Sequence, residues 1–563
     1  MASSCSSGAP LAAFMVLSIS IQLVVVVKAN TFLKASPVDN QERIRQEDIE
    51  RSLFTEIEGT FGEGSAATRF ALFEDSLTSM FAALPKNEHG NLGRSTVRYA
   101  LHRLFVQRHG WFLNGLHDAG GHRNVSSDGL LKEEVPAYIQ DLFESVLAGK
   151  GFGLHELAVV AATIEHFVHQ EAIKQLQDAF NLHEHAPTAE LNEKEVDQVM
   201  DTYMMAYILN ENLANLSHEE AADLKDEMPD VFLAWNATRR FVHDVRINVT
   251  RFESNAEQKK SGLFDFSLVA RIAERVGERF GRFQDLECKQ IRSSLYAIEE
   301  SGTGRVRLSD FYKPALDGSW QFQESQKYLR QLGALDESDP QNPRVIIANY
   351  ISSPSNCIAS SSFYSVCCID ECEGLLGHLE QQIAAPEATA EQIVRLVTKM
   401  PSSSMVAPRV LSKTLLNRLL AIDEEHGGKV PLHGRLFAQW MHHAFPRECP
   451  YPHVAGTTNP QTPDEWLDST GEDTTASMED IQALLDNAQN SSQEELDADF
   501  LPWSPEEELL VVRPGQDVQG AKSSSLRTVV LFAAMASLMY GLVHSTSGSK
   551  GQIYGVSMEK MHV

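Results

Sequence analysis

Residues 299–310 carry oxygen-bearing side chains at intervals that suit the binding of a cation. Glu299, Ser301 and Thr303 stand at alternate positions, and Asp310 follows seven residues after the last of them. Carboxylate and hydroxyl oxygens are the ligands that hard divalent cations such as calcium prefer. The spacing therefore predicts a small cation site in a loop between two helices.

The segment resembles an EF-hand, the helix–loop–helix motif that binds calcium. Counted from Glu299, a glycine that permits a sharp turn, Gly304, falls at the sixth place. The resemblance implies a backbone ligand at Arg305 and a pairing contact with a second loop through Val306. Hydroxyls replace two of the usual carboxylates, and Asp310 is one methylene shorter than the usual glutamate. We therefore expect binding no tighter than about 10⁻⁴ M, the alternative being a loop that keeps the fold and binds no metal.

A second loop with the same pattern begins at Asp423. Glu425 takes the third place, two glycines follow, and Val430 takes the eighth place. Gly434 stands where the bidentate carboxylate would be, so this loop has only two acidic ligands. The resemblance implies that two such loops work as a pair, which predicts a bridge between Val430 and the eighth residue of the first loop. The alternative is that the two loops are unrelated turns.

A third, more eroded loop is predicted between Leu84 and Thr96, where His89 precedes a turn glycine. Pro85 and Thr96 would occupy its first and last ligand places, and neither suits a cation, so we expect a structural turn.

Histidines raise the question of a transition metal. One group is spread along a predicted helix and its exit: His155, His166, His169, His183 and His185. Their spacing does not match a zinc-protease helix, so we expect core or surface histidines. A second group lies near the end of the folded region and comprises His433, His442, His443, Cys449 and His453. It supports the alternative of a secretory-pathway metalloenzyme, although no nucleophile elbow or phosphate loop accompanies it.

The elements around these residues are mainly helical by their apolar spacing. Helices are predicted over Glu47–Phe61, Ala67–Leu84, Ser95–Leu116, Lys132–Leu147, His155–Leu182, Asn192–Leu213, Ala221–Val249, Asp265–Arg282, Leu286–Ile298, Gln321–Leu332, Val410–Ile422 and Leu432–Phe445, with one short strand at Arg344–Ile351. The fold class that follows is mainly α: a multi-helical ectodomain with EF-hand-like helix–loop–helix units and one C-terminal transmembrane helix.

The cysteines and sequons indicate an oxidising compartment. Six cysteines remain after a predicted signal peptide: Cys288, Cys357, Cys367, Cys368, Cys372 and Cys449. An even number with a serine-rich cluster favours disulfides over a thiolate metal site, and fifteen pairings are open. Glycosylation acceptors are predicted at Asn124, Asn215, Asn236, Asn248 and Asn490.

The organisation along the chain follows from shifts in composition. A mostly apolar run that ends before Ala29 predicts a secretory signal, with an uncleaved anchor as the alternative. Thr528–Val543 has no charged residue and predicts a membrane helix. The predicted parts are a signal peptide (1–29), a helical domain (40–254), an EF-hand-like domain with a disulfide-braced loop (262–454), an acidic disordered stalk (455–525), a transmembrane helix (526–546) and a short tail (547–563). Within the stalk, a short helix is expected at Ser477–Leu485, and the apolar islands Phe500–Trp503 and Leu509–Val512 could dock on a domain or a partner.

The formal net charge of −29 over 563 residues excludes nucleic acid as a favoured partner and leaves divalent cations and proteins. The phrases LPKNEHGNLGRSTVRYALHRLF and GKVPLHGRLFAQW are similar to uncharacterised membrane-anchored proteins of single-celled algae, a resemblance that implies no activity. We expect a single-pass membrane glycoprotein with its body in the lumen or outside the cell. Its ectodomain would be a weak calcium-binding or protein-interaction module, with a metal-free scaffold or adhesion ectodomain as the alternative.

Overall fold

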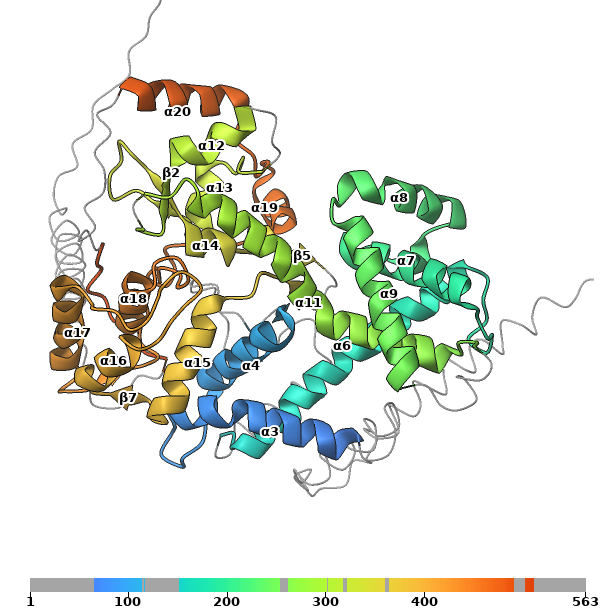
Figure 1. Cartoon of the computed structure of the whole chain (residues 1–563), viewed down its shortest axis with the longest axis horizontal. Helices are drawn as coiled ribbons and strands as arrows, with labels where there is room; N and C mark the ends of the chain where they lie inside the picture. The colour runs from blue at the N-terminus through green and yellow to red at the C-terminus, as the bar shows by residue number, and fades with distance from the viewer. Residues whose placement is uncertain are drawn as a thin grey trace, which may run out of the picture. The chain divides into compact units, whose positions relative to one another are not determined.

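The computed structural model describes residues 65–113, 116, 151–253, 262–300, 302–316, 321–359, 364–490 and 502–510. This part of the chain is mainly helical, as predicted, and contains sixteen α-helices (Figure 1). They are α3 (Ser65–Ala83), α4 (Arg94–His109), α6 (Leu154–Leu182), α7 (Glu193–Leu209), α8 (His218–Val231), α9 (Trp235–Phe252), α11 (Phe266–Tyr296), α12 (Leu308–Leu316), α13 (Gln326–Gln331), α14 (Ile347–Ile351), α15 (Glu371–Ile383), α16 (Ala390–Val397), α17 (Lys413–Glu425), α18 (Arg435–Ala444), α19 (Pro463–Thr470) and α20 (Met478–Asn490).

The strands of the described part are short. They are β1 (Trp111–Leu113), β2 (Arg305–Arg307), β3 (Leu335–Asp336), β4 (Arg344–Ile346), β5 (Ile358–Ala359), β6 (Tyr364–Val366), β7 (Glu387–Ala388) and β8 (Val430–Pro431). They form small antiparallel sheets with the orders β1-β6-β5, β2-β4-β3 and β7-β8.

Four antiparallel bridges join loops that each lead into a helix. The bridged residues are Leu92 with Phe152, Leu191 with Phe264, Val306 with Val345, and Ala388 with Val430. All eight side chains are at most 3% exposed. Seven of the eight stand two residues before the first residue of a helix, and Val430 stands five residues before α18. The described part of the chain is therefore a series of helix–loop–helix units joined in pairs at their loops.

The predicted bridge between Val306 and Val430 is wrong. Val306 pairs with Val345 of β4, and Val430 pairs with Ala388 of β7. Each loop takes its partner from the nearest helix–loop–helix unit along the chain, because closing a short connection costs less entropy than closing a long one. Arg344–Ile351, predicted as one strand, contains strand β4 and then helix α14.

Helix α11 is one continuous helix, whereas the sequence predicted two with a break between Arg282 and Leu286. It packs against α4, α6 and α9 and, further along, against α14 (Figure 1). A Cβ atom at Gly281 would lie 1.9 Å from the carbonyl oxygen of His109, so only glycine lets the turn after α4 cross the helix there. The predicted helix over Ala221–Val249 is in fact two, α8 and α9, because the backbone leaves the helical conformation at Phe232, where φ is −126° and ψ is 97°.

Part of the predicted disordered stalk is folded. Helices α19 and α20 lie within residues 455–525, and Trp466, Ile481 and Leu485 are buried in a core that also contains Phe311 and Tyr328. Three large apolar side chains are sufficient to dock these helices although the segment is acidic overall. The described residues 502–510 also pack on the body, with Trp503 against the core around α17 and α18.

None of the helices in the described part combines the length and apolar character that a membrane span needs. The predicted signal peptide and the predicted span Thr528–Val543 lie outside the described residues, as do the predicted helices over Glu47–Phe61 and Lys132–Leu147.

Candidate functional site

The loop that begins at Glu299 runs between α11 and α12, as predicted. The Glu299 side chain is 1% exposed. Its Oε1 accepts a hydrogen bond from the Gly304 backbone N–H at 2.5 Å, and its Oε2 lies 2.7 Å from Arg447 Nε and 2.5 Å from Arg447 Nη2. The carboxylate at the first ligand place thus faces an arginine, which supplies the positive charge that a cation would bring.

Gly304 is what allows Arg447 to reach this loop. Its φ of +72° lies in the left-handed region, and an added Cβ would fall 2.2 Å from the Pro446 carbonyl oxygen. The turn glycine therefore has two roles: it allows the loop to bend, and it leaves room for the backbone of Pro446, the residue before Arg447, to pack against the loop.

The other predicted ligands of this loop also have partners within the protein. Thr303 Oγ1 donates to the Glu300 carbonyl at 2.7 Å, and the Arg305 carbonyl accepts from Glu300 N–H at 2.9 Å. Asp310 forms a 2.5 Å ion pair with the exposed Lys313. Ser301 lies outside the described residues. In the part of the chain that the structure describes, no three His, Cys, Asp or Glu side chains are grouped as a metal site.

Glu300, which the ligand spacing of the loop does not single out, joins the two loops of this pair. Its carboxylate, 7% exposed, accepts from Arg307 Nε on Oε1 and from Arg344 Nε on Oε2, both at 2.6 Å. Arg307 and Arg344 are opposite one another in the β2–β4 register, so Glu300 lies between two like charges and reduces their repulsion. Nearby, Arg305 Nε donates to Asp336 Oδ2 at 2.6 Å, and the guanidinium lowers the pKa of Asp336 against the opposing effect of burial.

The loop that begins at Asp423 is closed by a different set of contacts. Asp423 Oδ1 accepts from the Ala390 N–H at 3.2 Å, at the start of α16, and the Asp423 carbonyl accepts from Gly428 N–H. Glu425 is exposed near the end of α17. The empty twelfth place at Gly434 lies beside the carboxylate of Glu507, which comes from residues 502–510.

The turn between Leu84 and Thr96 contains a lysine at the end of α3. Lys86 Nζ donates to the carbonyls of Phe81, Ala82 and Leu84 at 2.6, 3.2 and 3.1 Å. Burial lowers the pKa of Lys86. A side-chain cation therefore meets the negative end of the helix dipole at this loop.

The six predicted cysteines form three disulfides: Cys288–Cys368, Cys357–Cys367 and Cys372–Cys449. Adjacent Cys367 and Cys368 have different partners, as expected. Cys288 of α11 is joined to the loop between β6 and α15, Cys357 and Cys367 flank the β5–β6 pair, and Cys372 of α15 is joined to the segment after α18.

The histidines are distributed among structural contacts. In the first group, His169 belongs to a buried cluster in which Glu165 lies 3.2 Å from His109 Nε2 and 2.6 Å from Arg69. In the second group, Cys449 is in a disulfide and its carbonyl lies 2.7 Å from His442 Nδ1. His433, His443 and His453 lie 2.7 to 2.8 Å from a Glu380 oxygen, the Pro502 carbonyl and the Gly333 carbonyl, in that order.

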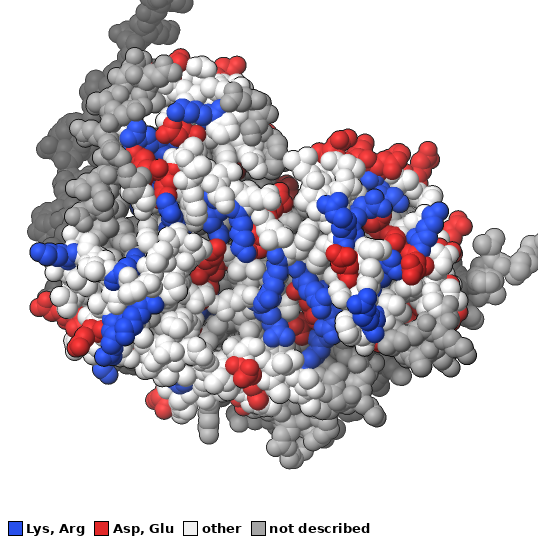
Figure 2. All heavy atoms as spheres, in the orientation of Figure 1, with Lys and Arg blue, Asp and Glu red and all other residues white. Residues whose placement is uncertain are grey.

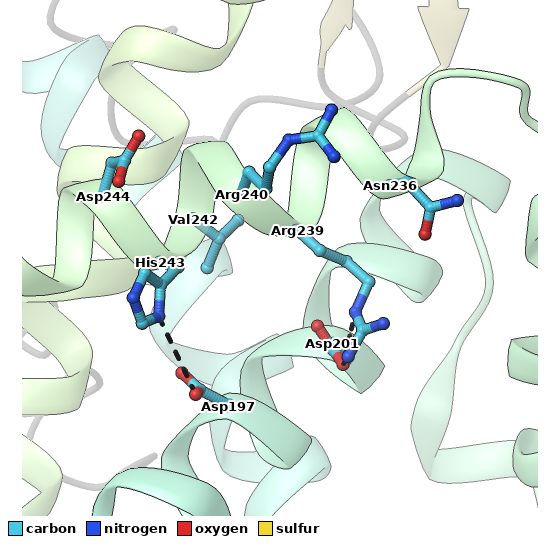
Figure 3. Close-up of a pocket in the computed structure, with 8 residues that line it drawn as sticks. All are labelled: Asp197, Asp201, Asn236, Arg239, Arg240, Val242, His243 and Asp244. Atoms are coloured by element: carbon cyan, nitrogen blue, oxygen red, sulfur yellow. Dashed lines mark hydrogen bonds and ion pairs between the residues drawn. The ribbon is translucent and has the colours of Figure 1, made fainter.

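A shallow pocket of about 560 Å³ lies between α7 and α9 (Figure 3). Two pairs of its lining residues are in contact: Arg239 Nε donates to Asp201 Oδ2 at 2.9 Å, and His243 lies 3.9 Å from Asp197. The sequon residue Asn236 lies at its edge. The lining also includes Arg240 and Asp244, so the pocket presents both signs of charge.

Three predicted glycosylation acceptors, Asn215, Asn236 and Asn248, are exposed. Asn124 lies outside the described residues, and only the backbone of Asn490 is described. On the face shown in Figure 2, acidic and basic side chains are interspersed over most elements, with acidic residues gathered over α8.

Comparisons with protein-family models, with curated proteins and with solved structures found no match to this chain.

Proposed function

We propose that the chain is a metal-independent protein-interaction scaffold built from EF-hand-like pairs, held by disulfides in the secretory pathway. The observation that carries the proposal is the contact of Arg447 with Glu299. A carboxylate that would be the first calcium ligand is 1% exposed and already bound by a guanidinium and a backbone N–H. Calcium would have to displace both.

The EF-hand-like ancestry is supported by the regular bridges. In this motif the eighth loop residue pairs with its partner loop and the exit helix begins shortly afterwards. Seven bridged residues with helices that start two residues later fit that arrangement. Several of the loops lack the acidic ligands of a calcium site, which agrees with a fold kept for its packing.

Protein cations also hold the rest of this loop and the turn after α3. In the same loop, Glu300 binds two arginines across β2 and β4, and after α3 Lys86 Nζ donates to helix-end carbonyls. These side-chain contacts are made without calcium, whereas a calcium site closes its loop only when calcium is bound. They support a scaffold whose shape does not depend on calcium.

The location is proposed from the chemistry of the cysteines. Three disulfides favour an oxidising compartment, and the exposed Asn215, Asn236 and Asn248 are accessible there to glycosylation. Anchoring through Thr528–Val543 and entry through the first 29 residues belong to the same proposal.

The test is thermal unfolding of the protein in a chelator and in millimolar calcium. We expect the melting temperature of the wild type to be the same in both solutions. The melting temperature of the double variant Glu299→Gln with Asp310→Asn should likewise not depend on calcium. A calcium-dependent rise in the melting temperature of the wild type that this double substitution removes would overturn the proposal in favour of a weak calcium site.

A further inference from the structure

Residues 502–510, PWSPEEELL, lie as a separate extended segment on helix α18. Nothing in the fold of α17 and α18 requires a strand there, since their loop is already bridged to β7. The segment instead makes its contacts through its main chain and a few side chains, as a bound peptide does.

Three side chains on one face of α18 hold the segment's backbone. Arg435, Gln439 and His443 are four residues apart, which places them in a row along the helix. His443 Nε2 donates to the Pro502 carbonyl at 2.8 Å. The Ser504 carbonyl accepts from Gln439 Nε2 at 3.0 Å.

The same row continues towards the start of the helix. Arg435 Nη2 also donates to the Ser504 carbonyl at 2.8 Å, and Arg435 Nε donates to the Glu506 carbonyl at 2.7 Å. Gln439 Oε1 accepts from Ser504 N–H at 2.9 Å. Four residues of a helix rise about 6 Å, and two residues of an extended chain span about 6.7 Å. Every second carbonyl of the segment therefore lies opposite the next side chain of the row on α18. Gln439 is 0% exposed and Arg435 6%. Both side chains also bond to the body, since Gln439 Oε1 accepts from Tyr451 Oη and Arg435 Nη1 donates to the Pro452 carbonyl, so they are held in place to receive the segment.

Two side chains of the segment add selectivity. The Trp503 ring stacks on His443 with centroids 6.3 Å apart, and the Arg418 guanidinium lies 4.9 Å from the centre of the indole. The site at this position therefore favours an aromatic side chain, whose ring face can form a cation–π interaction with Arg418.

Glu507 is the second selective side chain. The N-cap of α18 is Gly434, which has no side chain to cap the helix. Glu507 Oε1 accepts from Leu436 N–H at 3.1 Å and lies 3.1 Å from where a Gly434 Cβ would be, while Oε2 lies 2.9 Å from His426 Nε2. A carboxylate at a helix N-terminus is stabilised by the helix dipole and the unpaired N–H groups.

We propose that the groove of α17 and α18 is a peptide-binding site for an extended acidic segment of a partner protein, with an aromatic residue and a glutamate four residues after it. The chain's own residues 502–510 occupy the site as a tethered competitor. This inference rests on the proposed interaction function. It names the surface and the chemistry of the partner.

The test uses the full-length chain with Trp503→Ala and Glu507→Gln, which weakens the tethered segment. A fluorescent peptide of residues 502–510 is titrated by anisotropy in the presence of a chelator. We expect saturable one-to-one binding to the double variant and at least about tenfold weaker apparent binding to the wild type. A tethered copy competes at an effective concentration of about millimolar when its linker is short.

Matched peptides test the chemistry. Peptides with Trp503→Ala or Glu507→Gln should bind at least about tenfold more weakly. A peptide with Glu506→Gln loses the same charge but should bind nearly as well, because the exposed Glu506 side chain contacts Ser504 of the segment itself, whereas the groove holds the Glu506 carbonyl.

Matched proteins test the groove. Adding Arg418→Ala to the double variant should weaken binding, whereas adding Lys413→Ala, an exposed residue of the same helix, should not. Arg418 is only partly buried, so this variant is expected to fold even if a change at Gln439 does not.

Several results would overturn the proposal. They are absence of binding by a double variant that still unfolds cooperatively, equal binding to wild type and double variant, and no response to the peptide substitutions. A wild-type chain that dimerises by exchanging residues 502–510 would make a second copy the occupant in place of a partner. Because the titration is done without calcium, these results are independent of the calcium test of the scaffold.

Discussion

At the scale of single residues, the carboxylates that looked like cation ligands are bound by arginines distant in the sequence. Glu299 meets Arg447, and Glu300 meets Arg344. These ion pairs have low exposure, so the loss of one partner leaves a charge that water does not solvate.

Replacing Arg447 with alanine should therefore destabilise the protein by about 2 kcal/mol, less than for a fully buried pair because Arg447 is 28% exposed. The matched change, Lys313→Ala, removes the exposed partner of Asp310 in the same loop and should cost no more than about 0.5 kcal/mol. Urea unfolding measures both. Equal effects would mean that the Arg447 contact does not hold the loop.

The buried His169 should make the protein sensitive to acid. Burial lowers the pKa of His169 to about 4, and the positive charges of Arg69 and His109 act in the same direction. The negative charges of Glu165 and Glu278 raise the pKa but do not outweigh these effects. Between pH 6.5 and 4 the unfolded chain binds a proton at this histidine and the folded chain does not, so stability falls as the pH falls through that window.

The expected contribution of His169 is a loss of about 2 kcal/mol between pH 7 and pH 5. Glu165, whose pKa is lowered to about 2, loses its contribution only below pH 4.5, as the pH falls towards that value. His169→Gln should reduce the loss of stability between the two pH values, measured by urea unfolding, by about that amount, and the exposed His89→Gln should leave the loss unchanged. An unaltered slope in His169→Gln would show that this imidazole titrates normally.

At the scale of elements, the unit of the fold is the helix–loop–helix pair, and neighbouring pairs share helices. Helix α6 leaves one bridged loop and enters the next, and α11 does the same. Each of these helices is the exit helix of one unit and the entry helix of the next, which accounts for their lengths of 29 and 31 residues.

Helix α19 belongs to this folded body although it comes from the acidic segment. Trp466 is 2% exposed and its ring lies 5.3 Å from Tyr328, so Trp466→Ala should cost about 3 to 5 kcal/mol. Leu467 is its neighbour and is 53% exposed, so Leu467→Ala should change stability by no more than about 0.5 kcal/mol. Thermal unfolding of both variants checks this. A small effect of Trp466→Ala would mean that α19 is only loosely docked.

At the scale of the whole molecule, the disulfides hold together segments that the helices alone leave apart. Cys288–Cys368 and Cys372–Cys449 close stretches of 80 and 77 residues, whereas Cys357–Cys367 closes 10. If the main effect is on the entropy of the unfolded chain, long closures stabilise more.

The double variant Cys372→Ser with Cys449→Ser should therefore lose about 2 kcal/mol more free energy of unfolding than the double variant Cys357→Ser with Cys367→Ser. Guanidinium unfolding of the two double variants under non-reducing conditions gives the comparison. The reverse order would indicate that local packing at each bond outweighs the length of chain that it closes.

The sequence by itself determined the local features of this protein. Apolar spacing predicted the mainly helical class and α6 nearly to the residue, because a helix depends on neighbours three or four positions apart. The loop after α11 was predicted from the spacing of its oxygen-bearing side chains and Gly304. The even number of cysteines predicted disulfides. The turn glycines at 304 and 428 were recognised because a left-handed conformation favours that residue.

Only the tertiary structure decided what each loop binds. The partner of Glu299 is 148 residues away, Glu507 reaches the start of α18 from 71 residues away, and Val306 pairs with Val345 in place of Val430. The local sequence around a loop carboxylate is the same whether its partner is a metal cation or an arginine. The partner depends on which remote segment of the chain packs beside the loop. The docking of α19 was hidden for the same reason: composition averages over a segment, whereas burial depends on the few side chains, such as Trp466, that meet a surface folded elsewhere.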